Sequence, residues 1–251
     1  MASVQVLGVD EFVTKYRYPG RGIMLGRDGD GTGFAAYFLT GRSEASRARR
    51  LVIGPDTLEI ADTTSGPADP LRHYTAIVRM SSGRIVVGNG TQVADVVAGL
   101  DAGTTVWQAL TGLECEPDPP ILTPRITATA AIGGTEVLEL VLSGAVAHPK
   151  WPAIEQSQHH LAHIPRLAPG EGHAMTTYAG DTGAVVTSGQ PVAVTVDGVW
   201  PQLLERIWGG LDPVLRVAAA VVPLTGDLRD GRFAGAHEPL ILQAGTGRST
   251  R

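Results

Sequence analysis

The sequence is poor in cysteine and contains no long hydrophobic run. Its single cysteine, Cys115, excludes a disulfide within the chain and any zinc site built from several cysteines, and it favours a reducing compartment. The longest apolar run, residues 214–224, is interrupted by Arg216 and falls short of the roughly 20 residues that span a bilayer. The first residues, MASVQVLGVDEF, lack the basic start and apolar stretch of a signal peptide. We therefore expect a soluble, cytoplasmic protein that has no membrane partner.

Basic residues are also fewer than acidic ones. The chain has 20 Lys and Arg against 25 Asp and Glu, a formal net charge of -5. A domain that binds nucleic acid normally shows a basic stripe or a high pI, so we expect no nucleic-acid partner. Hydrophobic residues make up 43% of the chain and charged residues 18%, which is enough apolar material for a substantial core. The protein should be globular, and any positive charge that it uses must be local.

Motifs for covalent catalysis and for triphosphate binding are missing. The sequence has no Gly-x-Ser-x-Gly elbow, and its glycine-rich stretch GRGIMLGRDGDGTG lacks the Gly-Lys-Ser/Thr ending of a P-loop. Cys115 lies between Glu114 and Glu116, whose negative charges oppose formation of a thiolate. The residues therefore offer no good candidate for a covalent nucleophile.

Two stretches resemble metal sites without completing one. Asp28 opens a match to the first half of a calcium loop, but the twelfth position is Leu39 instead of a bidentate Glu, so a tight turn is the better interpretation. His159, His160 and His163 lie close together, and the first and third would share a helical face. Because no carboxylate or fourth ligand follows at characteristic spacing, we favour a polar surface or loop and expect no metal.

The pattern of apolar residues predicts a mixture of sheet and helix. Helical spacing predicts helices at residues 93–100, with Thr91 as N-cap, at 105–113 and at 201–211. Short apolar runs bounded by Gly, Pro and Asp predict strands at residues 34–41, 50–55, 57–62, 74–80, 84–90, 126–132, 135–146, 173–180 and 191–196. We expect an α+β protein with helices layered on antiparallel sheet, organised as a single domain over residues 1–251 with a flexible tail at 244–251.

Arginines gather in one short segment, GRSEASRARR, at residues 41–50. Guanidinium groups bind phosphate or carboxylate in a bidentate manner, and nearby serine hydroxyls add donors, so the segment is a candidate anion site. A solvated basic loop explains the same pattern equally well. The glycines on either side of Arg21 would let a ligand approach the backbone closely.

A proline-rich crossing, EPDPPILTPR, separates the two halves of the sequence. Its prolines restrict the backbone, so Glu116, Asp118 and Arg125 can be held at fixed places with little ordering cost on binding. That is how a site is preorganised, but a loop whose charges face water would have the same composition. The residues alone leave both interpretations open.

Together these segments resemble the archaeal-type IMP cyclohydrolase family. The resemblance rests on the order and spacing of GRGI at residues 20–23, LTGRSEASRARR at 39–50, VGNG at 87–90, EPDPPILTPRI at 116–126 and TTYAGD at 176–181. It covers residues 18–196, and the chain departs from the archaeal pattern by extensions at both ends and by inserted loops. The family implies a four-layer αββα sandwich of two antiparallel sheets flanked by helices, like that of the N-terminal nucleophile hydrolases but without their nucleophile.

The family also implies a reaction and a set of site residues. The reaction closes the purine ring of 5-formamidoimidazole-4-carboxamide ribotide to give inosine monophosphate (IMP) and water, and it requires no cofactor. By motif match, substrate-binding groups are expected at Arg21, Arg42, Ser43, Arg47, Asp118 and Arg125, and catalytic groups at Glu116, Tyr74 and Asn89.

Each group has an implied role. Glu116 would act as acid/base, while Tyr74 and Asn89 would position or polarise the formyl group. The arginines would hold the phosphate or the imidazole carboxamide, with Arg125 as a further substrate cation.

Other functions fit the same residues. A high content of Ala, Gly and Arg indicates a GC-rich, bacterial genome, so a related ring-closing enzyme of secondary metabolism is one alternative. A non-catalytic protein that binds purine nucleotides is another, and an amidohydrolase processed to expose Ser3 is a third. We expect a small-molecule purine nucleotide monophosphate as the ligand and a homo-oligomer as the assembly.

Overall fold

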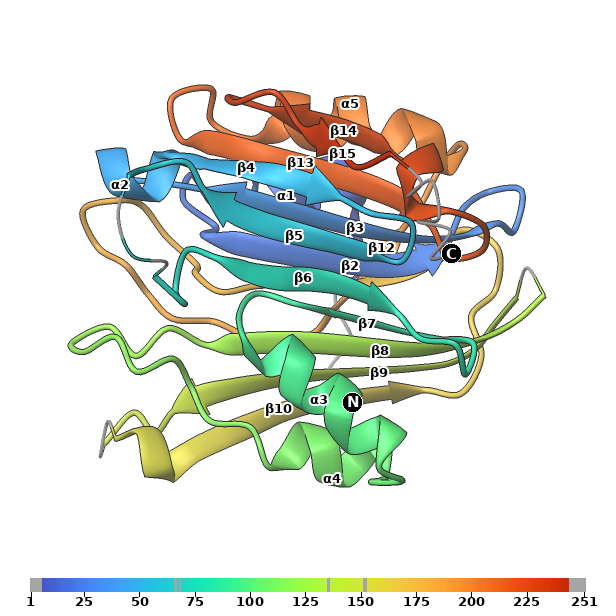
Figure 1. Cartoon of the computed structure of the whole chain (residues 1–251), viewed down its shortest axis with the longest axis horizontal. Helices are drawn as coiled ribbons and strands as arrows, with labels where there is room; N and C mark the ends of the chain where they lie inside the picture. The colour runs from blue at the N-terminus through green and yellow to red at the C-terminus, as the bar shows by residue number, and fades with distance from the viewer. Residues whose placement is uncertain (1–5, 66, 68, 135, 151–152, 244–251) are drawn as a thin grey trace, which may run out of the picture.

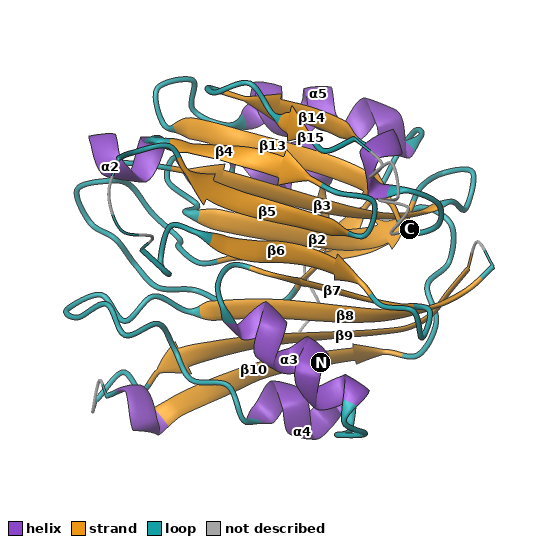
Figure 2. Cartoon of the chain, viewed as in Figure 1, coloured by secondary structure: helices purple, strands orange, loops and turns teal. Residues whose placement is uncertain are grey.

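A computed structural model describes residues 6–243 of the chain, except 66, 68, 135 and 151–152. The tail expected at residues 244–251 lies outside this described part. The protein is mixed α/β, with two large sheets and few helices (Figures 1 and 2). None of the described helices is long and apolar enough to cross a membrane.

The first sheet has seven strands, and its neighbours are antiparallel except for one parallel pair at an edge. Across the sheet the order is β1 (Val6–Gly8), β12 (Val192–Thr195), β11 (Glu171–Thr176), β2 (Arg21–Arg27), β3 (Gly33–Thr40), β13 (Arg216–Pro223) and β14 (Arg232–Gly235).

The second sheet has eight strands and again one parallel pair at an edge. Its order is β10 (Ser157–Ile164), β9 (Glu136–Ala147), β8 (Arg125–Gly133), β7 (Arg84–Gly88), β6 (Tyr74–Arg79), β5 (Thr57–Asp62), β4 (Arg49–Ile53) and β15 (Leu240–Ile241).

Helices are short and lie outside the sheets or at their ends. The α-helices are α1 (Val9–Thr14), α2 (Glu44–Arg47), α3 (Gln92–Asp101), α4 (Val106–Thr111) and α5 (Leu203–Gly210). Three 3₁₀ turns complete the described helical residues, namely η1 (Ile154–Gln156), η2 (Trp200–Gln202) and η3 (Leu228–Asp230).

Three groups of buried apolar residues set the order of the layers. The largest joins inward-facing residues of both sheets, for example Leu25 of β2 and Leu58 of β5. A second packs α1 and α5 against the outer face of the first sheet, and a third packs α3 and α4 against the outer face of the second. The layers therefore follow as helices, sheet, sheet, helices. Burial of these faces is the main source of stability, because alternate side chains of each central strand leave water.

Turn chemistry explains two connections that the sequence predicts. Asp28 accepts hydrogen bonds from the backbone N–H groups of Thr32 at 2.8 Å and Trp200 at 2.8 Å, so its carboxylate closes the turn between β2 and β3. Gly83 has φ 77° between β6 and β7, a left-handed conformation that glycine adopts without strain. The tight turn at Asp28 and the hairpin at Gly83 are thus confirmed.

The predicted helices are present with small shifts at their ends. Thr91 is the N-cap residue of α3, although its side chain caps no backbone group. Thr105 caps α4 through a box in which its side chain accepts from the Gln108 backbone and Gln108 returns the bond. A 3₁₀ turn precedes α5, so that helix begins two residues later than its predicted start at Pro201.

Six strands were absent from the prediction, namely β1, β2, β10, β13, β14 and β15. β2 and β13 are buried on both faces, so their sequences do not alternate between apolar and polar residues. β10 contains the histidines His159, His160 and His163, and a loop was the wrong expectation there, because this segment pairs with β9 over eight residues. Two of these histidines still share a face, since positions four apart in a strand point the same way.

Candidate active site

A pocket of about 240 Å³ opens at one end of the two sheets. It lies where β2 and β4 begin and β3 ends, beside α2 and the loop that joins α4 to β8, at the left of Figure 1. The lining residues are Tyr18, Gly20, Arg21, Thr40, Ser46, Arg49, Asp69, Leu71, Arg72, Glu116, Asp118, Thr123 and Tyr178. Segments far apart in the sequence thus meet because both sheets end at the same place.

Glu116 is the buried carboxylate of this pocket, with only 2% of its surface exposed. Its Oε2 accepts a hydrogen bond from Arg21 at 3.1 Å, and its Oε1 accepts one from Asn89 at 3.2 Å. Burial raises the pKa of Glu116 above its ordinary value, and the nearby charge of Arg21 only partly offsets that rise. A carboxyl group in this state can exchange a proton closer to neutral pH than an exposed glutamate can.

Arg21 is the cation that holds Glu116 in place. It is 9% exposed, and its second amino group donates to the Leu71 carbonyl at 3.2 Å. Burial opposes its charge, but the fields of Glu116 and of the nearby tyrosines Tyr74, Tyr37 and Tyr178 together outweigh that effect and hold the pKa of Arg21 well above its ordinary value. The two residues therefore form a buried ion pair at the floor of the pocket.

Asn89 and Tyr74 lie behind this pair and do not line the pocket. Asn89 is fully buried, and its side chain also bonds the Pro124 carbonyl at 2.9 Å and the Ile126 N–H at 2.8 Å. The Tyr74 ring lies 5.9 Å from the Arg21 guanidinium, and its hydroxyl pairs with that of Tyr37 at 2.7 Å. Both residues support the buried pair from behind.

Arg49 is a second buried cation in the pocket, and it makes no direct ion pair among the described residues, although its charge acts on Asp62, which faces it across β4 and β5. Its guanidinium donates to two backbone carbonyls, those of Ser46 at 2.8 Å and Thr40 at 3.4 Å. Burial lowers the pKa of Arg49, and the charge of Arg21 acts in the same direction. A buried guanidinium without a counter-ion is costly unless an anion binds beside it.

A chain of short hydrogen bonds forms another wall. Asp118 accepts from both the backbone N–H and the hydroxyl of Thr123, each at 2.6 Å, and the same hydroxyl contacts the Tyr178 hydroxyl at 2.6 Å. Thr123 is fully buried, and Tyr178 is 7% exposed. Burial raises the pKa of Tyr178 to about 12, so the phenol keeps its proton at neutral pH.

The structure brings together only part of the predicted site. Arg21, Glu116 and Asp118 line the pocket, while Arg125 lines a neighbouring recess of about 100 Å³ that also touches Glu116. The predicted site residues that do not line the pocket are Asn89, Tyr74, Arg42, Ser43 and Arg47.

The predicted residues of the α2 turn have other partners. Ser43 caps α2 in a capping box with Ser46. Arg42 is exposed and donates to the Thr182 carbonyl at 3.4 Å, and Arg47 donates to the Arg42 carbonyl at 3.4 Å. Their assignment to a phosphate therefore stays a prediction.

Of the residues that line the pocket, sequence reasoning assigned only Arg21, Glu116 and Asp118 to the site, and Arg49, Thr123 and Tyr178 are among those that it missed. Arg49 belongs to the arginine-rich segment, but the sequence did not show that it alone of that group is buried. Tyr178 lies in the TTYAGD segment at residues 176–181, and the resemblance of that segment to the family was the available signal. Thr123 had no signal beyond its place in the proline-rich crossing.

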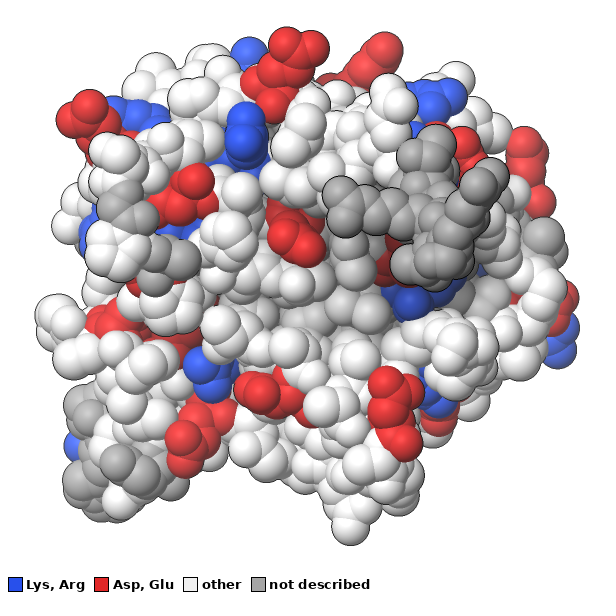
Figure 3. Space-filling model, viewed as in Figure 1, with Lys and Arg blue, Asp and Glu red and all other residues white. Residues whose placement is uncertain are grey.

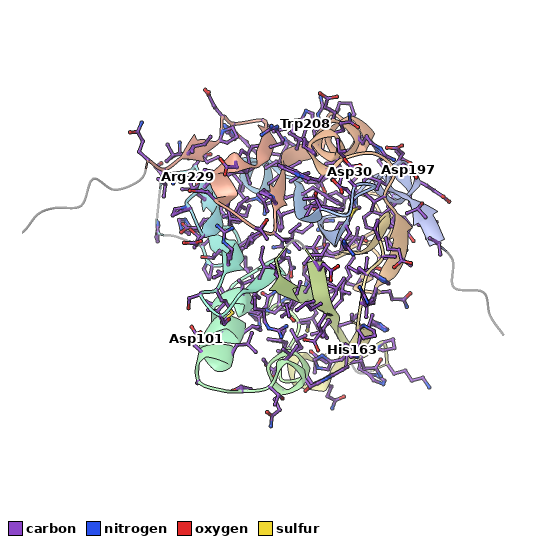
Figure 4. All side chains as sticks on the ribbon, turned by 90° about the vertical axis from the view of Figure 1, so that its right-hand side faces the viewer. Asp30, Asp101, His163, Asp197, Trp208 and Arg229 are labelled. Atoms are coloured by element: carbon purple, nitrogen blue, oxygen red, sulfur yellow. The ribbon has the colours of Figure 1, made fainter. Side chains whose placement is uncertain are left out.

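The histidines of β10 are not part of this site. His163 contacts Glu139 at 3.4 Å and the Trp107 ring at 5.6 Å. Figure 4, which views the end of the molecule opposite the pocket, shows His163 at the periphery. Over residues 6–243 with the stated gaps, no group of three or more His, Cys, Asp or Glu is placed to hold a metal ion.

Among the described residues, one face of the molecule shows no concentrated patch of charge (Figure 3). On the face drawn in Figure 3, acidic and basic side chains are interspersed among uncharged ones. The concentrated positive charge that matters for the pocket is buried, at Arg21 and Arg49.

A preorganised carboxylate beside buried guanidinium groups, in a concave pocket, is typical of a protein that acts on a small anionic molecule. Residues 18–223 match the family model described as IMP cyclohydrolase-like protein, and the chain belongs to this family. A comparison with curated protein sequences found no match.

Proposed function

We propose that this protein is an IMP cyclohydrolase, which converts 5-formamidoimidazole-4-carboxamide ribotide to IMP and water. Family membership supports a reaction of this type. The observation that carries the proposal is Glu116, a buried carboxyl group whose pKa is raised by burial and which is fixed by Arg21 and Asn89.

The chemistry requires orientation and proton transfer. The carboxamide nitrogen forms a bond to the formyl carbon of the same molecule, and one of its protons reaches the formyl oxygen. The C–OH bond then breaks, the formamido nitrogen gives up its proton, and the hydroxyl leaves as water. Because both reacting groups belong to one substrate, the protein has to select their productive orientation and supply an acid/base group.

We assign the proton transfers to Glu116. Its raised pKa suits a group that must accept a proton from the attacking nitrogen and later donate one to the leaving hydroxyl. Arg21 holds the carboxyl group and adds positive charge where negative charge develops on the formyl oxygen.

We assign the phosphate of the nucleotide to the part of the pocket lined by Arg49. An anion beside this guanidinium would form the direct ion pair that Arg49 makes with no described carboxylate. The Arg72 side chain also lines the pocket, although it already pairs with Asp69 at 2.9 Å.

We also infer a relation to the N-terminal nucleophile hydrolase fold. The order of helices, sheet, sheet, helices supports it. In the proposed mechanism no N-terminal nucleophile takes part, because the attacking atom belongs to the substrate.

The test is direct. Purified protein is mixed with 5-formamidoimidazole-4-carboxamide ribotide without added metal or cofactor, and IMP is followed by chromatography. We expect turnover by the wild type, a fall in kcat of about 10²–10⁴-fold in Glu116→Gln, and little change in the matched control Glu114→Gln, whose side chain is exposed.

Each other result has a meaning. Full kcat in Glu116→Gln would remove this residue from the acid/base role. IMP that binds but is never formed would favour a nucleotide-binding protein or an enzyme acting on an analogous nucleotide.

A further inference from the structure

The hydrogen bonds around Thr123 have a fixed direction. The Asp118 carboxylate can only accept, and both of its oxygens lie 2.6 Å from a Thr123 donor, the backbone N–H or the hydroxyl. A threonine hydroxyl has one hydrogen, so that hydrogen is committed to Asp118. The oxygen of the Thr123 hydroxyl is left as an acceptor.

This direction determines what Tyr178 presents to the pocket. Its hydroxyl lies 2.6 Å from the Thr123 hydroxyl oxygen, which has no hydrogen left to donate, so Tyr178 is the donor in that contact. The phenol keeps its proton because burial raises the pKa of Tyr178 to about 12. With its hydrogen turned toward Thr123, the Tyr178 oxygen offers only lone pairs to a ligand.

The ring of Tyr178 is held firmly in this orientation. It stacks on Tyr18, with ring centroids 5.4 Å apart and planes inclined by 24°. It also packs against Gly20, where a Cβ atom would come within 2.4 Å of the tyrosine ring. Close packing against both neighbours restricts rotation of the ring and keeps its hydroxyl at the pocket.

We propose that Tyr178 is a specificity-determining residue that accepts a hydrogen bond from a ribose hydroxyl of the bound nucleotide. This inference rests on the proposed function. A phosphate group offers acceptors and would be repelled by a lone pair, so it belongs near Arg49. The reacting carboxamide has to face Glu116, which leaves the ribose hydroxyls as the donors available to Tyr178.

The experiment compares ribose and deoxyribose ligands. The affinities of IMP, 2′-deoxy-IMP and 3′-deoxy-IMP are measured by calorimetry for the wild type and for Tyr178→Phe. We expect one deoxy ligand to bind the wild type about fivefold to tenfold more weakly than IMP, as for loss of one neutral hydrogen bond. In Tyr178→Phe this difference should disappear, because the accepting oxygen has been removed.

Three further variants test the direction of the bonds. Tyr18→Phe alters the stacked neighbour and should keep the difference between the ligands. Thr123→Ser keeps the hydroxyl and should also keep the difference in affinity between IMP and the deoxy ligand. Thr123→Val frees the Tyr178 hydrogen to turn toward the pocket, so the difference should shrink, while thermal melting reports whether each variant is folded.

The outcomes separate this inference from the proposed function. If IMP binds the wild type and both deoxy ligands bind it as tightly as IMP does, the role of Tyr178 is overturned and the proposed function stands. The same holds if the difference in affinity between IMP and a deoxy ligand survives in Tyr178→Phe. If none of the three nucleotides binds the wild type, both are overturned.

Discussion

Two sets of arginines near the pocket have opposite surroundings. The surface set, Arg42 and Arg47, belongs to the α2 turn and donates to nearby backbone carbonyls. The buried set, Arg21 and Arg49, lines the pocket and is less than a tenth exposed. The cost of removing a guanidinium from water applies only to the buried set, so only there does the charge require a structural or functional reason.

The buried set is itself divided. Arg21 has its counter-charge within the protein, at Glu116. Arg49 has backbone carbonyls and no ion-pair partner in the described part of the chain. One guanidinium is therefore paired within the protein, while the other is the one to which we assign the phosphate of the proposed substrate.

The largest effect should follow from breaking the internal pair. Arg21→Met leaves Glu116 buried without its cation, and loss of one partner of a buried pair costs about 3–5 kcal/mol of the free energy of unfolding. Urea unfolding measures this loss, and turnover should be abolished with it. Arg21→Met combined with Glu116→Gln should recover part of the stability, because no unpaired charge remains. A single variant as stable as the wild type would show that water already reaches Glu116.

Arg49→Met should have the opposite pattern. Without ligand its stability should equal or exceed that of the wild type, because an unpaired buried charge has been removed. Its affinity for IMP should fall about 10²-fold, the loss expected for a charge-assisted contact of roughly 2–3 kcal/mol. The exposed neighbour provides the control, since Arg50→Met should change neither quantity. Undiminished affinity in Arg49→Met would place the phosphate elsewhere.

The contrast between the two sets of arginines also shows what local sequence patterns can and cannot predict. The strands with alternating or bounded apolar runs and the helices α3, α4 and α5 follow from local patterns, and these predictions are confirmed. β2 and β13 were not predicted, because strands that are buried on both faces lack the alternation of apolar and polar residues. β10 was not predicted, because its histidines interrupt the apolar pattern of this edge strand.

At the site, Arg21, Glu116 and Asp118 were predicted from motifs and do line one pocket. Burial within the arginine-rich segment could not be predicted, because Arg49 and Arg50 are adjacent and differ only in which face of β4 they occupy. That face is set by pairing with β5 and by the first sheet, which packs behind β4, and both are contacts between distant segments.

The pH dependence of stability and of kcat/KM should show a smaller effect of the pair formed by Arg21 and Glu116. Since burial raises the pKa of Glu116 in the folded state, the folded protein binds more protons than the unfolded chain just above the ordinary value of 4.5. The contribution of this group to stability therefore falls as pH rises through the folded pKa. The acid limb of kcat/KM should lie above 4.5 and remain there in Glu114→Gln. A limb at the ordinary value would mean that Glu116 is not the titrating group.

The smallest effect should come from the surface set. Arg42→Ala combined with Arg47→Ala removes two guanidinium groups whose contacts are backbone carbonyls of the α2 turn and of the segment near Thr182. Because charges in water are screened and already solvated, we expect KM to rise no more than about threefold, with kcat unchanged. The rise in KM should be larger at low salt than at high salt. Steady-state kinetics at two ionic strengths measure this. A rise in KM as large as the loss of affinity in Arg49→Met would restore the assignment made from the motif and would mean that the α2 turn folds over the bound phosphate.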